Sequence, residues 1–384
     1  MKKICIVTGS RAEYGLLKRL MSMINSEKTM KLQIIVTNMH LCSEFGNTYK
    51  EIESDGFIID KKIEMLLSSD TPSAITKSFG LATIGFADAF IDLQPDMLLV
   101  LGDRSEILAA ATSALFFKIP VVHLHGGEIS EGAYDESIRH AISKMSHIHF
   151  TSTIQHRERV LQLGEDPEMV HNVGAIGVDN IKHLKLISKS KLENELNFNF
   201  SNKVIIVTYH PTTNENENDE IAFLNILKAL DYFKDVKIIF TLPNSDTNNN
   251  LIKKLIIDYV NNNTDRAVVF ASLGQLKYYS TLMFVDAVVG NSSSGIIEAP
   301  SFGVPTINIG NRQKGRTKGS SVFDTTIFYD QIRETMYQVL YKTNKNSFKN
   351  SLNPYDKAGT AANIIAVLKN VNLDKIVLKK FHTV

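Results

Sequence analysis

The chain has 384 residues, a formal net charge of +1 at pH 7 and two cysteines. This length suits two domains of ordinary size. The near-zero net charge offers no general attraction to nucleic acid or to an anionic membrane, so we expect neither as a partner. Cys5 and Cys42 provide no disulfide framework, the first residues predict a strand instead of a signal peptide, and no apolar run approaches membrane-spanning length. A cytoplasmic protein is therefore expected.

Predicted strands and helices alternate along the first half of the chain. Strands are predicted at residues 3–8, 32–37, 97–101, 120–124 and 148–151, and helices at 12–24, 72–93, 106–117, 135–145 and 153–163. The stretch 38–56 is polar, lacks a periodic pattern and is expected to be an irregular loop with a functional role. Alternation of this kind is typical of a parallel sheet with helices on both faces.

The alternation starts afresh after a polar stretch at residues 184–202. Strands are predicted at 203–207, 236–241, 268–270, 282–289 and 306–309, and helices at 221–233, 251–261, 273–282, 296–302, 329–341 and 355–368. We therefore predict two doubly wound α/β domains, 1–182 and 183–365, followed by a tail, 366–384, for which packing against the first domain is one option. Neither half contains a G-x-G-x-x-G or a G-x-x-x-x-G-K-[ST] motif, which disfavours a dehydrogenase and a P-loop enzyme.

The stretch Val288–Lys318 combines features of a nucleoside diphosphate site. A strand, a turn of small residues, a short helix and a second strand form a βαβ unit. The turn and the start of the helix contain Ser292, Ser293, Ser294 and Gly295, whose hydroxyls and exposed N–H groups attract phosphate. Glu298, about one turn later, can accept hydrogen bonds from a ribose diol. The next strand is followed by four cations able to close over a diphosphate, Arg312, Lys314, Arg316 and Lys318. A capped helix followed by a solvated basic loop is the alternative, but the combination favours the nucleotide.

Charged and imidazole side chains gather at the predicted carboxyl ends of strands, where open α/β sheets bind ligands. They are Arg11, His40, Asp103, Arg104, His123, His125, Glu128, Asp135, Glu136, Arg139, His140 and His210. Carboxylates crowded into one site shift each other's pKa, so one can act as an acid and another as a base. Asp103 and Asp135 have an alternative role at the starts of helices, as a cap and as a complement to the helix dipole. The spacing of His123, His125 and Glu128 matches no strong zinc signature, so no metal is expected.

The chain contains, in this order, the segments TGSRAEYG, LGDRSE, HLHGGE, YDESIRHAISKMSH, YHP and GNSSSGIIEAPSFGVPTINIGNRQKGR. Together they resemble the hydrolysing UDP-N-acetylglucosamine 2-epimerases of sialic acid biosynthesis, over nearly the whole chain. The resemblance implies a GT-B-like fold, with two Rossmann-like domains and the active site in the cleft between them. It also implies that UDP-N-acetylglucosamine and water give N-acetylmannosamine and UDP without a cofactor. A homo-oligomer, either a dimer or a tetramer, is expected.

The family mechanism, carried over by resemblance, has two stages. A base removes the proton from sugar C2 while UDP leaves C1, which gives a 2-acetamidoglucal; water then adds to C1 and C2 is reprotonated on the other face. The family's UDP-binding positions correspond to Arg11, His210, Asn244, Ser292, Ser293, Glu298 and Arg312, and its catalytic carboxylates to Asp103 and Asp135. Further candidates are His40, Arg104, Ser294, Gly295 and Arg316 for substrate binding, and His125, Glu128 and His210 for catalysis.

Two positions depart from the pattern of the wider family. Much of that family has a glutamate where this chain has His125, so either this histidine or Glu128 takes over the proton transfer, and the acid and the base stay unassigned. Many relatives carry a phosphate-binding lysine where this chain has Leu16, so Arg312 and Arg316 are expected to contribute more to phosphate binding.

Three alternatives remain open. The same reaction on a UDP-2,4-diacetamido-trideoxyhexose, UDP-N,N'-diacetylbacillosamine of the legionaminic acid pathway, needs the same motifs, and the EFGNTYKEIESDGF stretch somewhat resembles that branch. A glycosyltransferase of the same fold needs no carboxylate cluster around C2. A non-catalytic sensor of nucleotide sugars is disfavoured by the opposed acids and histidines.

Overall fold

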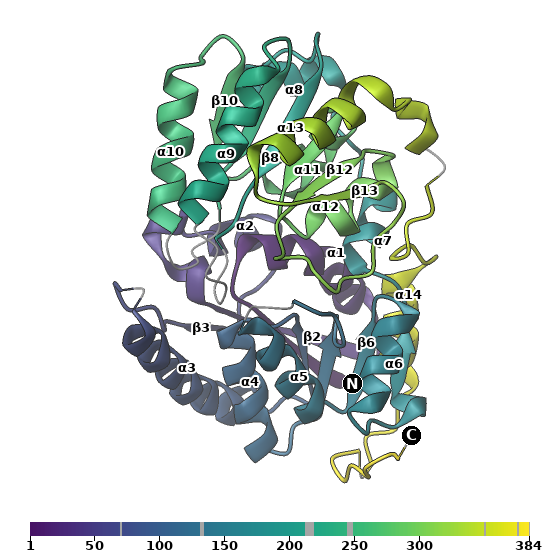
Figure 1. Cartoon of the computed structure of the whole chain (residues 1–384). Helices are drawn as coiled ribbons and strands as arrows, with labels where there is room; N and C mark the ends of the chain where they lie inside the picture. The colour runs from purple at the N-terminus through teal and green to yellow at the C-terminus, as the bar shows by residue number, and fades with distance from the viewer. Residues whose placement is uncertain are drawn as a thin grey trace. The chain divides into compact units, whose positions relative to one another are not determined.

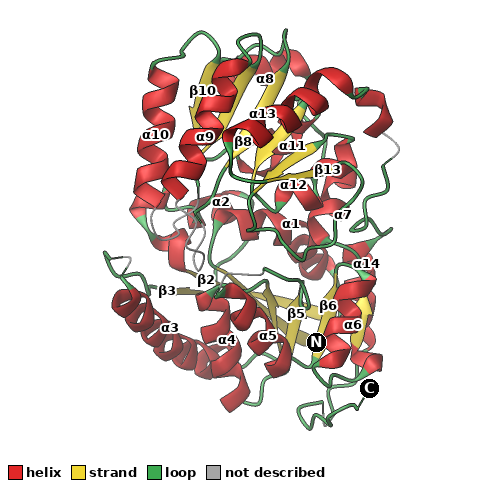
Figure 2. Cartoon of the chain, viewed as in Figure 1, coloured by secondary structure: helices red, strands yellow, loops and turns green. Residues whose placement is uncertain are grey.

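The computed structural model describes residues 1–69, 71–130, 134–211, 219–243, 249–348, 351–374 and 376–383. The chain divides into two compact units, which we describe separately. The first unit comprises Met1–Glu128, Asp135–Asn180 and Lys357–Val384, and the second comprises Ile129–Tyr134 and Ile181–Asp356. Each unit holds one sheet with helices packed on it (Figures 1 and 2). The domain bounds expected at residues 182 and 365 stay predictions.

The sheet of the first unit has seven described strands, in the order β3-β2-β1-β4-β5-β6-β7, and all neighbouring strands are parallel. The strands are β1 (Lys2–Thr8), β2 (Met30–Thr37), β3 (Lys61–Ile63), β4 (Met97–Leu101), β5 (Val121–Leu124), β6 (Ile148–Thr151) and β7 (Val170–Asn172). The helices are α1 (Arg11–Ser26), α2 (Tyr49–Ser54), α3 (Pro72–Leu93), α4 (Ser105–Phe116), α5 (Asp135–Met145), α6 (Ile154–Gln162), α14 (Thr360–Asn370) and α7 (Ile176–His183), which begins in this unit. The order of the strands reverses between β1 and β4.

The side chains of β1 show why this sheet is covered on both faces. Ile4 and Ile6 belong to a buried cluster with residues of α1 and α14, whereas Cys5 and Val7 belong to a second cluster with residues of α3 and α4. Successive side chains of a strand point to opposite faces, so an unbroken apolar strand needs a helix layer on each side. The apolar run at the start of the chain therefore predicts a central strand, and β1 is one.

The sheet of the second unit has six described strands, in the order β10-β9-β8-β11-β12-β13, again with parallel neighbours. They are β8 (Val204–Thr208), β9 (Lys237–Thr241), β10 (Ala267–Phe270), β11 (Ala287–Gly290), β12 (Thr306–Ile309) and β13 (Val322–Thr325). The helices are α8 (Lys189–Leu196), α9 (Asp219–Tyr232), α10 (Asn249–Asn261), α11 (Gly274–Leu282), α12 (Ser294–Ile297) and α13 (Tyr329–Tyr337). Ile205 and Val207 pack with α9, and Val204 and Ile206 pack with α8 and α11. The prediction of two doubly wound, Rossmann-like units is confirmed.

Several predicted elements were wrong in detail. The loop expected at 38–56 contains two short 3₁₀ helices and α2, and the polar stretch 184–202 contains α8. The strand expected at 282–289 begins only at Ala287, because Leu282 still belongs to α11. The helix expected at 296–302 is α12 followed by a 3₁₀ turn that contains Pro300, which has no N–H for an α-helical bond. The last helix starts at residue 360 instead of 355, after the left-handed Gly359.

Other departures concern short or apolar segments. The strands β3, β7 and β13 were not predicted; each has three or four residues and lies at the edge of its sheet, where one-sided pairing leaves no long apolar run. The helix predicted at 329–341 is α-helical to Tyr337 and then π-helical over 338–342. The helix α3 meets the length and composition of a membrane span, contrary to the expectation that no apolar run comes close. Its Phe86 and Phe90 pack in the core of the first unit.

Candidate active site

The first unit places two polar turns at the point where its strand order reverses. One is the β1–α1 turn, where the Ser10 side chain accepts a hydrogen bond from Glu13 N (3.3 Å), so α1 begins at Arg11. The other is the β4–α4 turn, where Gly102 adopts a left-handed conformation (φ +80°) before Asp103 and Arg104. Because β1 and β4 are neighbouring parallel strands, both turns lie at the same edge of the sheet, as the sequence predicts for ligand-binding loops.

Asp103 is paired with Arg139 of α5. Arg139 Nη2 contacts Asp103 Oδ2, its Nη1 donates to His125 O (3.1 Å) and lies 3.9 Å from Glu128 Oε2, and the side chain is almost completely buried. Burial by itself would lower the pKa of Arg139, but Asp103, Glu128 and Asp135 raise it above its usual value, so the guanidinium stays charged. The residue that caps α4 is Arg104, so the capping role considered for Asp103 does not apply.

His125 is held by protein groups at both ring nitrogens. Its Nδ1 lies 2.9 Å from Glu128 Oε1, and its Nε2 accepts a hydrogen bond from Ile176 N (3.4 Å). An acceptor Nε2 places the proton of the neutral ring on Nδ1, which then donates to Glu128. Glu128 is buried and also accepts from the Ser152 hydroxyl (2.8 Å). His125 therefore positions the Glu128 carboxylate at the end of β5.

The chain around His125 is sterically demanding. His125 itself has φ +65°, a left-handed conformation that side chains rarely adopt. Gly127 has φ +76°, and a Cβ there would lie 2.2 Å from His156 O. The two glycines of HLHGGE therefore make the turn that brings His125 and Glu128 together.

Two other predicted histidines are buried and neutral. His123 contacts Gly102 O (2.8 Å) with Nε2 and Ser143 Oγ (3.1 Å) with Nδ1, and burial lowers its pKa to about 3. His40 contacts Thr8 Oγ1 (3.1 Å) with Nε2, and burial lowers its pKa to about 4. Among the residues that the structure describes, no group of three or more His, Cys, Asp or Glu side chains could hold a metal ion.

Asp135 and Arg11 border this cluster. Asp135 is the first residue of α5 and is partly exposed, one turn before Arg139 on the same helix. Arg11 forms a surface ion pair with Glu51 of α2, with 2.7 Å between Nε and Oε2. The buried Arg139 thus contacts Asp103, His125 and Glu128 and interacts electrostatically with Asp135. The sequence analysis noted Arg139 near the start of a predicted helix but did not assign it to the site.

The second unit has a corresponding arrangement at its own reversal of strand order, between β8 and β11. His210 N donates to Asn291 Oδ1 (2.7 Å), and Asn291 Nδ2 donates to His210 O (2.8 Å). The two loops approach so closely that a Cβ at Gly290 would lie 1.9 Å from Thr208 O. Asn291 therefore clamps the β8–α9 loop to the β11–α12 turn, and His210 is fixed through its backbone.

The predicted phosphate-binding serines follow this clamp. Ser293 precedes α12 but makes no capping hydrogen bond with its side chain, and Ser294 Oγ donates to Tyr278 OH (2.8 Å). Gly295 lies against Thr306, whose Cγ2 would be 2.6 Å from a Cβ at that position. Ser292 lies in the turn itself, and Glu298 is buried at the end of α12. Asn244 lies outside the described residues.

The four cations after β12 separate into different surroundings. Arg312 Nη1 donates to Asn291 O (3.1 Å), so this cation lies at the β11–α12 turn. Gln313 Nε2 donates to the same carbonyl (2.8 Å), a contact that no motif in the sequence indicates. Arg316 Nε donates to Ile129 O (3.0 Å), and Lys318 Nζ pairs with Asp324 (2.7 Å). Of these contacts, the hydrogen bond of Arg312 is the one that ties a cation to the serine turn.

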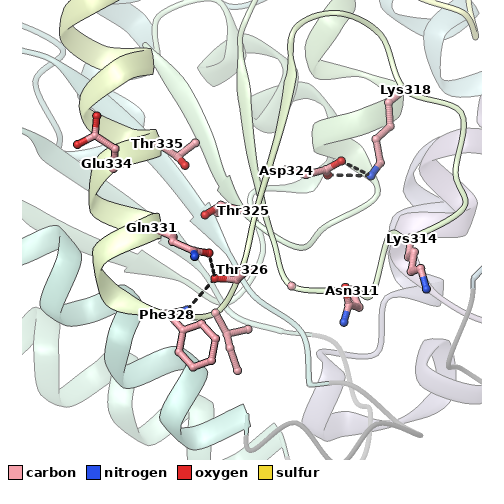
Figure 3. A pocket seen from close by; sticks show the side chains of 12 residues that line it. Asn311, Lys314, Lys318, Asp324, Thr325, Thr326, Phe328, Gln331, Glu334 and Thr335 are labelled. Atoms are coloured by element: carbon pink, nitrogen blue, oxygen red, sulfur yellow. Dashed lines mark hydrogen bonds and ion pairs between the residues drawn. The ribbon is translucent and has the colours of Figure 1, made fainter.

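Lys314 lines a cavity of about 910 Å³ in the second unit. The cavity lies at the carboxyl ends of β12 and β13, and Figure 3 shows Asn311, Lys314 and Lys318 on one side of it and Gln331 and Thr335 of α13 on the other. The basic run thus borders an open space large enough for part of a nucleotide sugar.

Comparison with known proteins gives a consistent family assignment. The family model described as UDP-N-acetylglucosamine 2-epimerase matches residues 22–369. The chain is 45% identical to a GDP/UDP-N,N'-diacetylbacillosamine 2-epimerase (hydrolysing) from Campylobacter jejuni, over 99% of this chain and 98% of that protein. It is 37% identical to a UDP-N,N'-diacetylbacillosamine 2-epimerase (hydrolysing) from Legionella pneumophila, over 99% of each.

Solved structures agree on the fold. A UDP-GlcNAc 2-epimerase from Neisseria meningitidis bound to UDP-GlcNAc is similar with a TM-score of 0.80 at 19% identity, over 95% of this chain and 99% of that one. The corresponding enzyme from Methanocaldococcus jannaschii, in complex with UDP-GlcNAc and UDP, gives a TM-score of 0.78 at 18% identity, over 96% and 100%. The family model covers every strand end described above except that of β1, and the two relatives cover 99% of the chain. On this evidence the chain belongs to the UDP-N-acetylglucosamine 2-epimerase family.

Proposed function

We propose that the protein is a hydrolysing 2-epimerase whose substrate is UDP-N,N'-diacetylbacillosamine, and whose products are UDP and the free sugar with the opposite configuration at C2. The two full-length relatives at 45% and 37% identity support this substrate over UDP-N-acetylglucosamine, which was our main expectation from the sequence. The observation that carries the proposed chemistry is the carboxylate cluster around Arg139 in the first unit.

The reaction needs a base, an acid and a leaving group. A carboxylate removes the proton from C2 while the C1–O bond breaks and UDP leaves with the bonding electrons, giving a C1–C2 double bond. Water then adds to C1, and C2 takes a proton on the opposite face. The C2 proton is weakly acidic, so the departing diphosphate must be held and stabilised for the base to act.

Asp103 and Asp135 are the carboxylates that we assign to proton transfer. Asp103 is paired with the buried, charged Arg139, which fixes the position of its carboxylate at the carboxyl end of β4. Asp135 lies on the same helix as Arg139 and remains partly exposed, as a group that exchanges protons with a substrate must be. His125 and Glu128 hold each other and Arg139, so in this assignment they orient Asp103.

The second unit supplies UDP binding in this proposal. Ser292, Ser293 and Arg312 share one turn, and a nearby carboxylate, Glu298, is available for the ribose hydroxyls. Arg312 suits a diphosphate because its planar group can donate two hydrogen bonds to one phosphate. His210, bonded to Asn291 beside this turn, and Lys314, which lines the cavity, are secondary candidates together with Arg316.

The test is a side-by-side incubation with UDP-N,N'-diacetylbacillosamine and UDP-N-acetylglucosamine, with UDP release and the configuration of the free sugar measured by NMR. We expect kcat/KM to be at least about tenfold higher for the diacetamido sugar, the scale of one good polar contact. Higher turnover of UDP-N-acetylglucosamine would instead favour our first expectation. A requirement for an acceptor sugar would make the protein a glycosyltransferase.

Cytoplasmic location and a homo-oligomer remain part of the proposal. Exposed apolar residues of α3, Leu81, Ile84 and Ile91, form a stripe on a helix whose other side is buried in the core. Such a stripe is typical of a surface that contacts another chain. Light scattering at several protein concentrations gives the number of chains in solution.

A further inference from the structure

Glu13 and Glu106 are buried carboxyl groups that the proposed chemistry does not use. Glu13 is 7% exposed and Glu106 is fully buried. Glu13 lies in the first turn of α1 and Glu106 in the first turn of α4, the helices that follow the neighbouring strands β1 and β4. Two carboxyls are therefore enclosed at the reversal of strand order, beneath the turns that carry Arg11 and Asp103.

The backbone of Gly9 lies between these two carboxyls. Gly9 N donates a hydrogen bond to Glu13 Oε2 at 2.6 Å. A Cβ added at Gly9 would lie 2.2 Å from Glu106 Oε1, so a larger residue would displace the Glu106 side chain. The Glu13 side chain of α1 and the Glu106 side chain of α4 thus lie on two sides of Gly9 in the β1–α1 turn.

Among the described residues, an ion pair joins a cation to Glu106 and none joins a cation to Glu13. Arg104 Nε donates to Glu106 Oε1 at 2.9 Å, which accounts for one negative charge. Glu13 Oε1 is buried, and no group in the described part of the chain donates a hydrogen bond to it. An ionised oxygen in that position would be strongly unfavourable, whereas a protonated carboxyl needs no cation.

The other titratable groups described nearby add no positive charge that would compensate a second carboxylate. His40, which contacts Thr8 at the end of β1, is neutral because burial lowers its pKa to about 4. Arg11 is paired with Glu51 at the surface. Burial and the charge of Glu106 raise the pKa of Glu13 to about 8, although the Gly9 N–H, Arg104 and Thr8 act in the opposite direction.

We propose that Glu13 is a neutral acid at neutral pH beside Glu106, which is paired with Arg104, and that the two glutamates are a positioning device which holds the β1–α1 turn, with Arg11, against the β4–α4 turn, with Asp103. One negative charge, shared with Arg104, binds the two turns together. A second charge beside it repels the first across Gly9 and loosens both turns. The effect on catalysis rests on the proposed function, but the protonation state and the loosening do not.

The sign of the pH effect follows from linkage. A carboxyl whose pKa is raised by folding stabilises the folded state fully below its unfolded pKa, and this contribution is lost as the pH rises through the folded pKa of about 8. Glutamine has nearly the same shape and no charge, so Glu13→Gln mimics the neutral acid at every pH. The variant should therefore lack the loss of stability that the natural protein shows on going from about pH 6 to about pH 9.

The experiment compares the natural chain with Glu13→Gln across this pH range. We expect the Tm of the natural chain to fall by about 5 °C more than that of the variant. A protonated-carboxyl stretching band should appear in the infrared spectrum of the natural chain and be lost in the variant. After division by the intrinsic exchange rate at each pH, the protection of amides in peptides that cover the two turns should fall at high pH in the natural chain only. Parallel Tm profiles, no lost band and equal exchange would overturn the proposal.

Glu165→Gln is the matched control, because Glu165 is buried but ionised. Burial by itself would raise its pKa, but His149, Lys379 and Lys144 lower it to about 2. The stabilisation that ionised Glu165 provides is present above the unfolded pKa and is lost only as the pH falls toward 2. The Tm of Glu165→Gln should therefore lie below that of the natural chain by a nearly constant amount between about pH 6 and about pH 9. A pH-dependent difference for Glu165→Gln as large as that for Glu13→Gln would also count against the proposal.

Kinetics separate positioning from packing. If wild-type turnover is measurable, kcat/KM of the natural chain should fall above about pH 8 several-fold more than that of Glu13→Gln, because only the natural pair gains the second charge. Equal profiles would refute the positioning role. Absence of turnover in every chain on either UDP-sugar would refute the proposed function, and the Tm, infrared and exchange results would still decide the protonation of Glu13.

Discussion

In each unit, side chains join the two loops at the point where the strand order reverses, but the kind of side chain differs between the units. In the first unit the β1–α1 and β4–α4 turns are joined by the carboxyls of Glu13 and Glu106 on either side of Gly9. In the second unit the β8–α9 and β11–α12 loops are joined by the neutral amide of Asn291, which bonds both backbone groups of His210. Each bridge has a glycine: a Cβ at Gly290 would collide with the backbone of Thr208, and a Cβ at Gly9 would displace the Glu106 side chain.

The difference fits the role that we assign to each unit. A neutral amide brings no charge of its own, so the surrounding N–H groups and Arg312 keep their full attraction for a diphosphate. A cluster of carboxylates around one buried arginine instead provides positioned groups that can accept and donate protons, which proton transfer requires. The comparison therefore predicts that variants of the first unit lower kcat, whereas variants of the second unit weaken UDP binding.

Asp103→Asn should give the largest effect on turnover. Removing the charge should lower kcat by roughly 10²–10⁴-fold, the scale of a positioned proton-transfer group, while UDP binding stays near normal. Steady-state kinetics and calorimetry with UDP measure the two quantities, and Tm shows whether losing the Arg139 pair unfolds the unit. Asp88→Asn, on the exposed side of α3, is the control. A loss of less than threefold in kcat would leave Asp103 without a catalytic role.

Arg312→Ala should give the largest effect on UDP binding. Leaving a partly buried phosphate without its partner should cost roughly 2–5 kcal/mol of binding free energy, with kcat at saturating substrate less affected. Calorimetry with UDP alone provides the measurement. Lys318→Ala is the control, because this lysine is already paired with Asp324. An unchanged Kd for UDP in the Arg312 variant would move the phosphate site elsewhere.

Asn291→Ala should show a smaller effect on the same quantity. The change removes the two hydrogen bonds that Asn291 makes to the backbone of His210, which costs about 1–3 kcal/mol and loosens the serine turn. We expect weaker UDP binding with a lower Tm, and little change in the pH dependence of kcat. Asn225→Ala, which removes one hydrogen bond to Ile327 elsewhere in the unit, controls for a general loss of stability. Equal UDP binding in all three proteins would mean that the clamp does not position the phosphate site.

Treatment with EDTA should have the smallest effect on turnover among these changes. The proposed partners of the diphosphate are Arg312 and backbone N–H groups, so turnover should survive chelation unchanged. Initial rates before and after chelation, and after adding back Mg²⁺ or Mn²⁺, provide the check. Loss of activity that a divalent ion restores would show that the second unit binds UDP through a metal.

The repeating strand and helix pattern was sufficient to predict the fold class, and the polar strand ends indicated the location of the candidate site. Apolar runs such as that of β1 are long and buried on both sides, so they are recognisable without a structure. The edge strands β3, β7 and β13 were missed because they are short and half-covered. The break between α12 and the following 3₁₀ turn was missed although Pro300 signals it.

The contacts within the site depended on tertiary structure. Arg139 is four residues after Asp135 in the sequence, but it pairs with Asp103, which lies in the β4–α4 turn of the same unit. The bond from Ile176 N to His125 and the bond from Gln313 to Asn291 have no sequence signature, because a backbone N–H and a glutamine side chain occur everywhere. The location of a polar group was therefore predictable, whereas its partner was not.

The most direct test of this account is the reaction of UDP-N,N'-diacetylbacillosamine in D₂O. Removal of the C2 proton by a carboxylate, followed by reprotonation from solvent-exchanged groups, predicts one deuterium at C2 of the released sugar and the opposite configuration at that carbon. NMR of the product reports both. A released sugar that keeps its original hydrogen and configuration at C2 would contradict the account, because the carboxylates of the first unit would then have no proton to transfer.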